Sequence, residues 1–203
     1  MLSMIPAQGG ARRKICGDCG PTSSLSPDGK QFLSSRADGS RPAIDVVDVD
    51  SGKSTQVLKH SKYPLGRPRF SPDGKWIVFL VLRGAALVDV MLAPFRGARS
   101  VPYQDWISVT SAPGNVNQVF WSPDSELLYY VINTAGSYSL MGRRLDRNHH
   151  PVSPPFRVYE FSGRFHPSSG PSLPADALTA VPGRFIGAMP EFTYNIWMMD
   201  LPK

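Results

Sequence analysis

The stretch Phe70-Ser-Pro-Asp-Gly-Lys-Trp-Ile-Val-Phe-Leu80 decides the fold that we expect for this chain. Its centre, Ser71-Pro-Asp-Gly-Lys75, occurs again as Ser26-Pro-Asp-Gly-Lys30 and, in a weaker form, as Ser122-Pro-Asp-Ser-Glu126. The copies start 45 and 51 residues apart, close to the period of about 40 to 50 residues that marks arrays of small antiparallel sheets. The chain is therefore built from repeats, each containing one of these turns.

The repeated turn has a physical basis in its residue types. Proline presets φ at about −65° at the first corner of a type I turn, and aspartate bonds the backbone two residues further on. Glycine adopts the left-handed conformation that a side chain resists. We assign this structural role to Ser26, Pro27, Asp28, Gly29, Ser71, Pro72, Asp73, Gly74, Ser122, Pro123 and Asp124. Ser125 stands where the other copies have glycine, so we expect that turn to be less favourable.

The sequence around each turn predicts two antiparallel strands joined in a short hairpin. The apolar residues that precede the turns are Leu25, Phe70 and Trp121. The strand-like runs that follow them are Gln31–Ser34, Trp76–Leu80 and Leu127–Val131. A second run, ending near an acidic residue, comes later in each repeat at residues 43–50, 87–92 and 138–146.

These patterns predict an all-β fold, a β-propeller of four-stranded antiparallel blades with about four blades plus a partial one, in an incomplete ring. We treat residues 1–203 as one such domain. The expected divisions are the outer half of a blade at 1–20, blades at 21–60, 61–112 and 113–155, and a last blade at 156–203, with a proline-rich loop at 151–174. In the last blade, Val181-Pro-Gly183 is a decayed turn between strands. Two explanations stay open: a fragment of a longer propeller, or a small propeller whose N-terminal strands complete the last blade.

Composition supports this expectation and excludes other classes. Glycine (18) and proline (20) make up nearly a fifth of the 203 residues, and 19% of the residues are charged, which excludes a coiled coil, a helical bundle and a charged disordered tail. The net charge of +6 is mild and does not by itself indicate a nucleic-acid partner. We expect no signal peptide, because residues 1–10 lack a basic region and an apolar core of useful length. We expect no membrane span, because the most apolar window, Trp76–Phe95, contains Arg83, Gly84 and Asp89.

Cys16 and Cys19 form a single Cys-x-x-Cys pair. Zinc requires four ligands, and the four histidines (His60, His149, His150 and His166) are not spaced as ligands. We favour an incidental or structural pair, and a local disulfide or a metal or redox pair are the alternatives. The sequence predicts no metal and no cofactor.

Other candidate groups have structural explanations that we prefer. Asp45, Asp48 and Asp50 suit a hard cation, but we expect these carboxylates to face solvent or to cap the turn. A second group is basic, with aromatic residues interleaved: Arg12, Arg13, Lys14, Lys59, Lys62, Tyr63, Arg67, Arg69 and Phe70. Phosphate binding requires such residues on one surface, and we expect a solvated face and no nucleic-acid site. The four tryptophans, Trp76, Trp106, Trp121 and Trp197, are expected in or beside the core.

No catalytic residue is expected. The Gly-x-Ser-x-Gly turn of the α/β-hydrolases does not occur in the sequence. His166 lies close to Ser168 and Ser169, but all three belong to the proline-rich stretch and are expected in a surface loop.

The segments Phe70–Leu80, Trp121–Tyr130 and Leu25–Leu33 resemble the TolB-type, WD-like β-propeller repeats. The hallmark of those repeats is an aromatic residue, Ser-Pro-Asp-Gly-Lys and an apolar strand. The resemblance covers nearly the whole chain and is specific for the fold, not for the function. It implies binding through loops at the opening of a central channel.

A narrower resemblance concerns Cys16–Gly20 and Asn195–Leu201, which look like parts of the C-terminal propellers of large bacterial multidomain proteins. In that group the propeller follows a Ser/Thr kinase or a winged-helix domain. The family's glycine before the last motif is Tyr194 here. The resemblance implies a non-enzymatic module that binds a protein partner, as the sensor or scaffold part of a signalling protein.

Two other functions stay open, a periplasmic TolB-like envelope protein and an accessory propeller of a prolyl-oligopeptidase-like peptidase. We also expect self-association, because an incomplete ring exposes the edges of its sheets.

Overall fold

The structure, a computed structural model, describes residues 2–17, 19–20, 22–36, 43–84, 87–110, 115–134, 137–161 and 178–187. In these ranges the regular structure is β, apart from one 3-10 turn, η1 (Tyr103–Asp105). The strands are β1 (Leu2–Met4), β2 (Arg13–Cys16), β3 (Thr22–Leu25), β4 (Gln31–Arg36), β5 (Ala43–Asp48), β6 (Ser54–Lys59), β7 (Leu65–Phe70), β8 (Trp76–Gly84), β9 (Leu87–Pro94), β10 (Ile107–Ser108), β11 (Asn115–Trp121), β12 (Leu127–Thr134), β13 (Ser137–Arg144), β14 (Phe156–Phe161), β15 (Leu178–Val181) and β16 (Arg184–Gly187). Over the same part of the chain, no helix has the length and hydropathy needed to cross a membrane.

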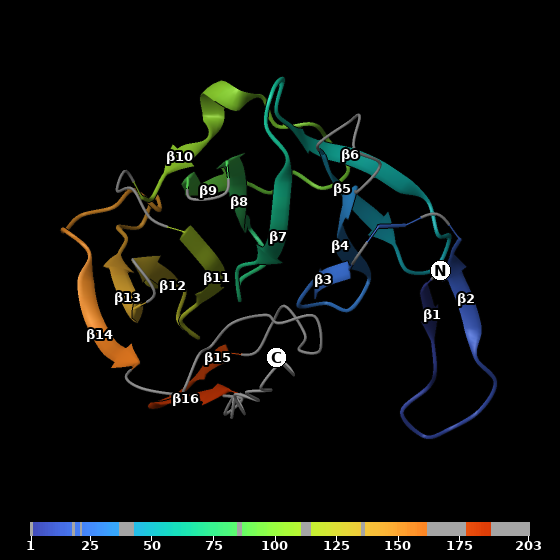
Figure 1. The fold of residues 1–203 in the computed structure, drawn as a ribbon. Helices are drawn as coiled ribbons and strands as arrows, with labels where there is room; N and C mark the ends of the chain where they lie inside the picture. The colour runs from blue at the N-terminus through green and yellow to red at the C-terminus, as the bar shows by residue number, and fades with distance from the viewer. Residues whose placement is uncertain are drawn as a thin grey trace, which may run out of the picture.

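Each of the three repeats forms one four-stranded antiparallel sheet with its strands in chain order. The sheets are β3-β4-β5-β6, β7-β8-β9-β10 and β11-β12-β13-β14, and two further two-stranded sheets are β1-β2 and β15-β16. Figure 1 shows these sheets arranged radially, with β3, β7, β11 and β15 nearest the centre. The predicted all-β architecture of four-stranded antiparallel blades in an incomplete ring is therefore confirmed.

The repeated turn joins the first two strands of each sheet through the side chains of its serine and aspartate. The hydroxyl of Ser71 donates to Asp73 at 2.5 Å, and the backbone N–H groups of Lys75 and Trp76 donate to Asp73 and to the Ser71 hydroxyl oxygen. The turns that begin at Ser26 and Ser122 contain the same three bonds. One hydroxyl thus bonds the carboxylate at the corner and the first residue of the next strand.

Ser125 keeps this geometry although it lacks the freedom of glycine. Its backbone N–H donates to the carbonyl of Ser122 at 3.0 Å, and its φ is +63°. The glycines at the same position of the other turns, Gly29 and Gly74, have φ of +73° and +71°. The turn therefore retains its shape, and Ser125 holds a conformation that side chains rarely adopt.

Sheet-on-sheet packing forms the core. One cluster joins the first and second sheets, with Leu33, Val46 and Leu58 against Phe70, Ile77 and Phe79. A second cluster joins the second and third sheets, with Val78, Leu80 and Val90 against Val119, Trp121 and Leu128. The middle sheet is thus apolar on both faces, and so its strand β8 contains a continuous apolar run from Trp76 to Leu82.

The N-terminal hairpin β1-β2 packs on the first sheet at its middle strands β4 and β5 and at the turn that follows β5. Leu2 and Ile15 lie against Phe32, and the guanidinium of Arg13 donates to the backbone carbonyls of Val49 and Asp50 at 3.0 Å each.

The third sheet extends further than the sequence predicted. Strand β14 pairs with β13 along its length, so Phe156–Phe161 belongs to the third sheet and the boundary predicted between residues 155 and 156 is wrong. The prolines at 151–155 suggested a break, but they lie in the connection between these two strands, where Leu145 bridges Pro151. The ring of Phe156 occupies the space in which Gly142 has no side chain, since a Cβ there would lie 2.5 Å from the ring.

The last two described strands form the predicted hairpin. β15 and β16 pair antiparallel, with Val181 opposite Arg184 across the turn Pro182-Gly183. The remaining part of this expected blade, including Asn195–Leu201, lies outside the described residues. Residues 162–174 of the proline-rich loop lie outside them as well.

We predict that Ser125→Gly stabilises the protein and Gly29→Ala destabilises it. A side chain in the left-handed conformation costs about 1–2 kcal/mol of folding free energy. Ser125→Gly removes this cost and Gly29→Ala introduces it. The greater freedom of glycine in the unfolded chain partly offsets both effects. A Cβ at Gly29 would meet no atom within 4 Å, so backbone conformation alone is tested. Chemical denaturation checks the pair, and equal stability of the three proteins would contradict the argument.

We predict that Gly52→Ala loosens the N-terminal hairpin. A Cβ at this position would lie 2.2 Å from the backbone oxygen of Ile15, so β2 must move away from the first sheet. Gly97→Ala is the matched control, because Gly97 has a similar φ of +67° with open space around it. Hydrogen exchange should accelerate in β1 and β2 for Gly52→Ala and stay unchanged there for Gly97→Ala.

Candidate functional site

The first strands of the three repeats, together with β15, surround a cavity of about 430 Å³ at the centre of the ring. Its walls come from β3, β7, β11 and β15 and from the turns that follow them. The lining residues are Ser24, Leu25, Pro27, Arg69, Phe70, Ser71, Pro72, Phe120, Trp121, Pro123, Thr179, Ala180, Val181 and Pro182. The structure therefore brings predicted turn residues from separate repeats to one place.

Four prolines give this cavity its character. Pro27, Pro72, Pro123 and Pro182 stand at corresponding places in successive turns, and each presents an apolar ring of fixed backbone conformation. Arg69 is the charged side chain among the described lining residues. The cavity is thus a mainly apolar mouth with one cationic side chain on its wall.

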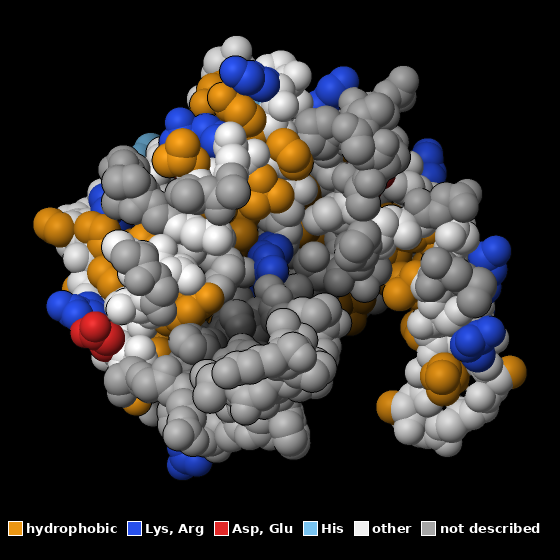
Figure 2. Space-filling view, viewed as in Figure 1, with side chains coloured by type: hydrophobic (Ala, Val, Ile, Leu, Met, Phe, Trp, Pro, Cys, Tyr) orange, Lys and Arg blue, Asp and Glu red, His pale blue; other side chains and the backbone are white. Residues whose placement is uncertain are grey.

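Irregular backbone occurs in the strands that line the cavity. The strand register shifts between Thr22 and Ser24 in β3, between Gly66 and Arg69 in β7 and between Val116 and Gln118 in β11. In β7 the shift includes Arg67, whose φ is +50°. Bulges redirect side chains next to binding sites, and Figure 2 shows basic atoms at the centre of this face, where Figure 1 draws β7.

The carboxylates of the turns are used inside the turns. A hydrogen bond from the Ser26 hydroxyl lowers the pKa of Asp28 below its usual value, and a weaker effect in the same direction comes from the backbone N–H of Lys30. Ser122 and the N–H of Glu126 lower the pKa of Asp124 in the same way. These carboxylates therefore stay ionised at neutral pH as acceptors that hold the hairpins.

Cys16 and Cys19 are joined in a disulfide, one of the alternatives that the sequence left open and not the incidental pair that we favoured. The bond ties the end of β2 to the segment that leads into β3. Among the described residues, no three His, Cys, Asp or Glu side chains are grouped to hold a metal ion.

The three aspartates of the second run have separate surroundings. Asp48 accepts from the N–H and hydroxyl of Ser51 at 2.8 and 2.7 Å and so caps the turn, while Asp50 is exposed beside Arg13. Asp45 contradicts the expectation of a solvent-facing carboxylate, because it is 6% exposed and accepts from Ser54 at 3.0 Å. The reason is that sheet packing covers both faces of β5.

The basic residues considered for nucleic acid lie on different elements. Arg13 and Lys14 belong to β2, Lys59 ends β6, and Arg67 and Arg69 lie in the innermost strand β7. Of the aromatic residues considered with them, Phe70 is buried and Tyr63 packs beside the first core cluster. Trp106 and Trp121 are buried as predicted, whereas Trp197, His166, Ser168 and Ser169 lie outside the described residues.

His149 was missed by sequence reasoning. Its buried ring stacks on Trp76, with centroids 4.6 Å apart, and meets Trp121 edge-on at 5.6 Å. The residue has a φ of +63° in the turn that Asp146 caps through the N–H groups of Asn148 and His150. Nothing in the dipeptide His149-His150 distinguishes the buried ring from the exposed one.

No family model matches the sequence, and no curated protein matches it. Several solved structures match this chain in fold. A TolB structure from Agrobacterium tumefaciens superposes with a TM-score of 0.60 at 20% identity, over 78% of this chain and 56% of that one. TolB from Acinetobacter baumannii gives 0.61 at 18% identity, over 93% of this chain and 45% of that one.

The chain has the fold of a TolB-like β-propeller. A prolyl endopeptidase structure also matches, with a TM-score of 0.57 at 16% identity, over 90% of this chain and 27% of that one. The present propeller thus spans about half the length of the two TolB chains and about a quarter of the peptidase chain. Likeness at these identities concerns the fold, in which each four-stranded sheet is one blade of the propeller.

We predict that acid destabilises this propeller through His149. Burial lowers the pKa of His149, although Asp73 and Asp146 oppose the shift. The unfolded chain takes up a proton at about pH 6.5 and the folded chain only at lower pH, so stability is highest above this pH and falls as the pH decreases through it.

Urea denaturation between neutral and mildly acidic pH measures this dependence. His149→Asn, which tolerates a positive φ, should reduce the slope of stability against pH, and His150→Asn at the exposed neighbour should leave it unchanged. Part of the slope should remain in His149→Asn, since burial also lowers the pKa of His60. Equal slopes for both variants would contradict the assignment.

Proposed function

We propose that this propeller is a non-enzymatic module that binds a protein partner at its central mouth. The observation that supports this most is the convergence of four inner strands on the cavity of about 430 Å³. Convergent loops on a rigid β scaffold are a common setting for recognition. The function needs no catalytic group, and Arg69 with the four prolines gives the mouth a definite chemistry.

The partner segment that fits this chemistry is an extended peptide with apolar residues and a carboxylate. Prolines and the neighbouring Phe70 and Trp121 offer an apolar wall, and arginine suits planar carboxylates because its guanidinium forms paired hydrogen bonds. The wider context that we propose is the sensor or scaffold part of a larger bacterial signalling protein, on the resemblance of Cys16–Gly20 and Asn195–Leu201.

A second candidate is a TolB-like protein of the bacterial envelope. The observation that favours it is the disulfide between Cys16 and Cys19, because disulfides persist in oxidising compartments and are rare in the cytosol. An accessory propeller of a peptidase is a third candidate, supported by the fold likeness to the prolyl endopeptidase.

We predict that panning a displayed random-peptide library on this propeller enriches sequences that combine an acidic with apolar residues. Arg69→Glu should weaken the selected peptides by about tenfold or more, equivalent to about 1.4 kcal/mol, and Arg69→Gln should weaken them less. Arg157→Glu is the control, since Arg157 pairs with Glu160 on the outermost strand β14. Peptides that bind Arg69→Glu as well as the wild type would contradict binding at the mouth.

We predict for the envelope candidate that Cys16 and Cys19 are oxidised in the cell. In bacteria quenched with acid, the protein should react with a maleimide of high mass only after reduction. Full labelling without reduction would indicate a reducing compartment and would favour the signalling candidate. The Cys16→Ser, Cys19→Ser variant gives the unlabelled reference.

A further inference from the structure

The apolar residue directly before the repeated turn is exposed in the first blade and buried in the second and third blades. Phe70 and Trp121, each directly before its turn, are both 6% exposed. Both face the preceding blade, Phe70 within the first core cluster and Trp121 within the second. Leu25 has the same position in the first blade and is 58% exposed.

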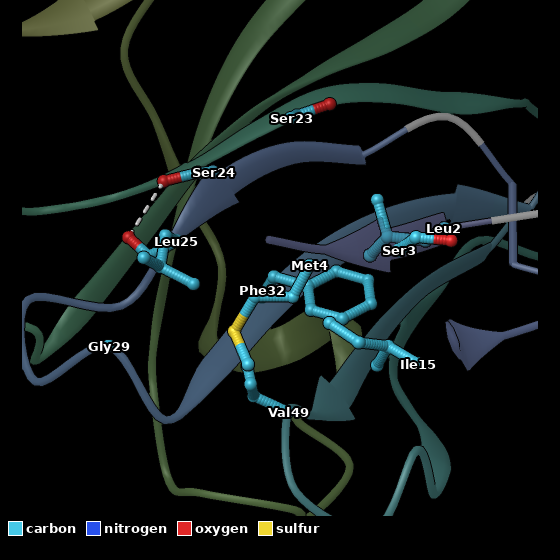
Figure 3. A pocket seen from close by; sticks show the side chains of 10 residues that line it. All are labelled: Leu2, Ser3, Met4, Ile15, Ser23, Ser24, Leu25, Gly29, Phe32 and Val49. Carbon is cyan, nitrogen blue, oxygen red and sulfur yellow. Dashed lines mark hydrogen bonds between the residues drawn. The ribbon is translucent and has the colours of Figure 1, made fainter. Parts of the chain in front are cut away.

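The surface beside Leu25 is a groove of about 380 Å³ between the N-terminal hairpin and the first blade. Figure 3 shows Leu2, Met4 and Ile15 on one side of it, and Leu25, Phe32 and Val49 from the first blade. The hairpin covers Phe32 and Val49 toward the outer strands. The inner part of the blade face, at Leu25, is left without a covering strand among the described residues.

The turn of the first blade gives a second, independent sign of the same unfilled position. In the second blade, a Cβ at Gly74 would meet the ring of Pro27 at 3.4 Å, so successive turns lie in contact. A Cβ at Gly29, the equivalent position in the first blade, would meet no atom within 4 Å, and this glycine lines the groove. The position that Pro27 takes beside the second blade is thus open beside the first.

The opposite end of the array exposes the complementary face. Phe185 of β16 packs against Phe120 and Tyr129 of the third blade, with ring centroids 6.2 and 4.8 Å apart. Ile186 therefore points to the other side of the hairpin, since neighbours in a strand alternate, and it is 57% exposed. Its counterparts in the first two blades, Leu33 and Val78, are 0% exposed because the next blade covers them.

The two ends also complement each other in strand position. The hairpin β15-β16 is an inner pair, joined by a turn and packed beside β11. The hairpin β1-β2 packs on Phe32 and Val47 of the middle strands β4 and β5, and it lies farther from the centre of the ring than β3 does (Figure 1). Within the described residues, β16 pairs with β15 alone and β1 pairs with β2 alone. An inner pair and an outer pair together make one four-stranded blade.

We propose that the groove at Leu25 is the docking site for a second copy of this chain, whose β15-β16 hairpin enters it. The contact continues the blade-to-blade packing within the chain: Ile186 and Thr179 of one copy face Leu25 and Phe32 of the other, and Pro182 reaches Gly29. A copy carries both surfaces, so copies associate head to tail, with the hairpin of one copy in the groove of the next. This inference does not rest on the proposed function, although Leu25, Thr179 and Pro182 also line the central mouth.

The test is a complementation experiment on the full 203-residue chain. Sedimentation velocity over about a hundredfold range of concentration should show reversible self-association, with a dimer as its first step. Leu25→Asp blocks the groove and Ile186→Asp blocks the hairpin, so each variant alone should dissociate at least about tenfold more readily. An equal mixture of the two should recover a dimer, because one intact groove and one intact hairpin remain.

Leu87→Asp is the matched control, because Leu87 is exposed on β9 away from both surfaces, and it should associate as the wild type does. Thermal melts of dilute protein verify that all variants are folded, which is expected since Leu25 and Ile186 are exposed in the single chain. A wild-type protein that stays monomeric at all concentrations overturns the proposal. This result would mean that the ring closes within one chain or that the groove binds a different polypeptide. Association that survives in both single variants, or a mixture that stays monomeric, overturns it as well.

Discussion

Every blade of this propeller has two apolar faces, and each face is stable only when another sheet covers it. The continuous apolar run Trp76–Leu82 of β8 shows this constraint in the sequence, and the core clusters between blades show it in the structure. Because covering one face leaves the next face to be covered, the constraint passes along the chain from blade to blade. It explains the radial arrangement in Figure 1 and the surfaces exposed at its two ends.

The central mouth follows from the same packing. Blades that meet face to face bring their first strands together, so the turns after these strands gather around one cavity without any long-range signal in the sequence. The chemistry of the mouth is then set by residues that the hairpins require for their own geometry. Proline is the clearest case, since Pro27, Pro72 and Pro123 shape the turns and also form the wall. Arg69 adds the charge, from a strand with an irregular register.

The sequence predicted what is local and repeated. The turns, the strands beside them and the blade architecture follow from residue types at fixed spacing, and Trp106 and Trp121 lie in the core as expected for tryptophans in or beside strands. Features that depend on tertiary packing were not predictable. The prolines near residue 151 suggested a break, yet β14 pairs across it, and Asp45 has a polar side chain in a strand covered on both faces. His149 is buried only because the turn that carries it folds back onto Trp76 and Trp121.

The serine–aspartate turn also has a consequence for how the protein is made. Its hydrogen bonds join residues at most five positions apart, and hairpins of this size form within about microseconds, much faster than a ribosome adds one residue. Each hairpin can therefore form as soon as it leaves the exit tunnel and offer a prepared face to the strands that follow. Synthesis then adds blades in order from the N-terminus, and the growing edge of the nascent chain is the surface that a ribosome-associated chaperone would have to shield.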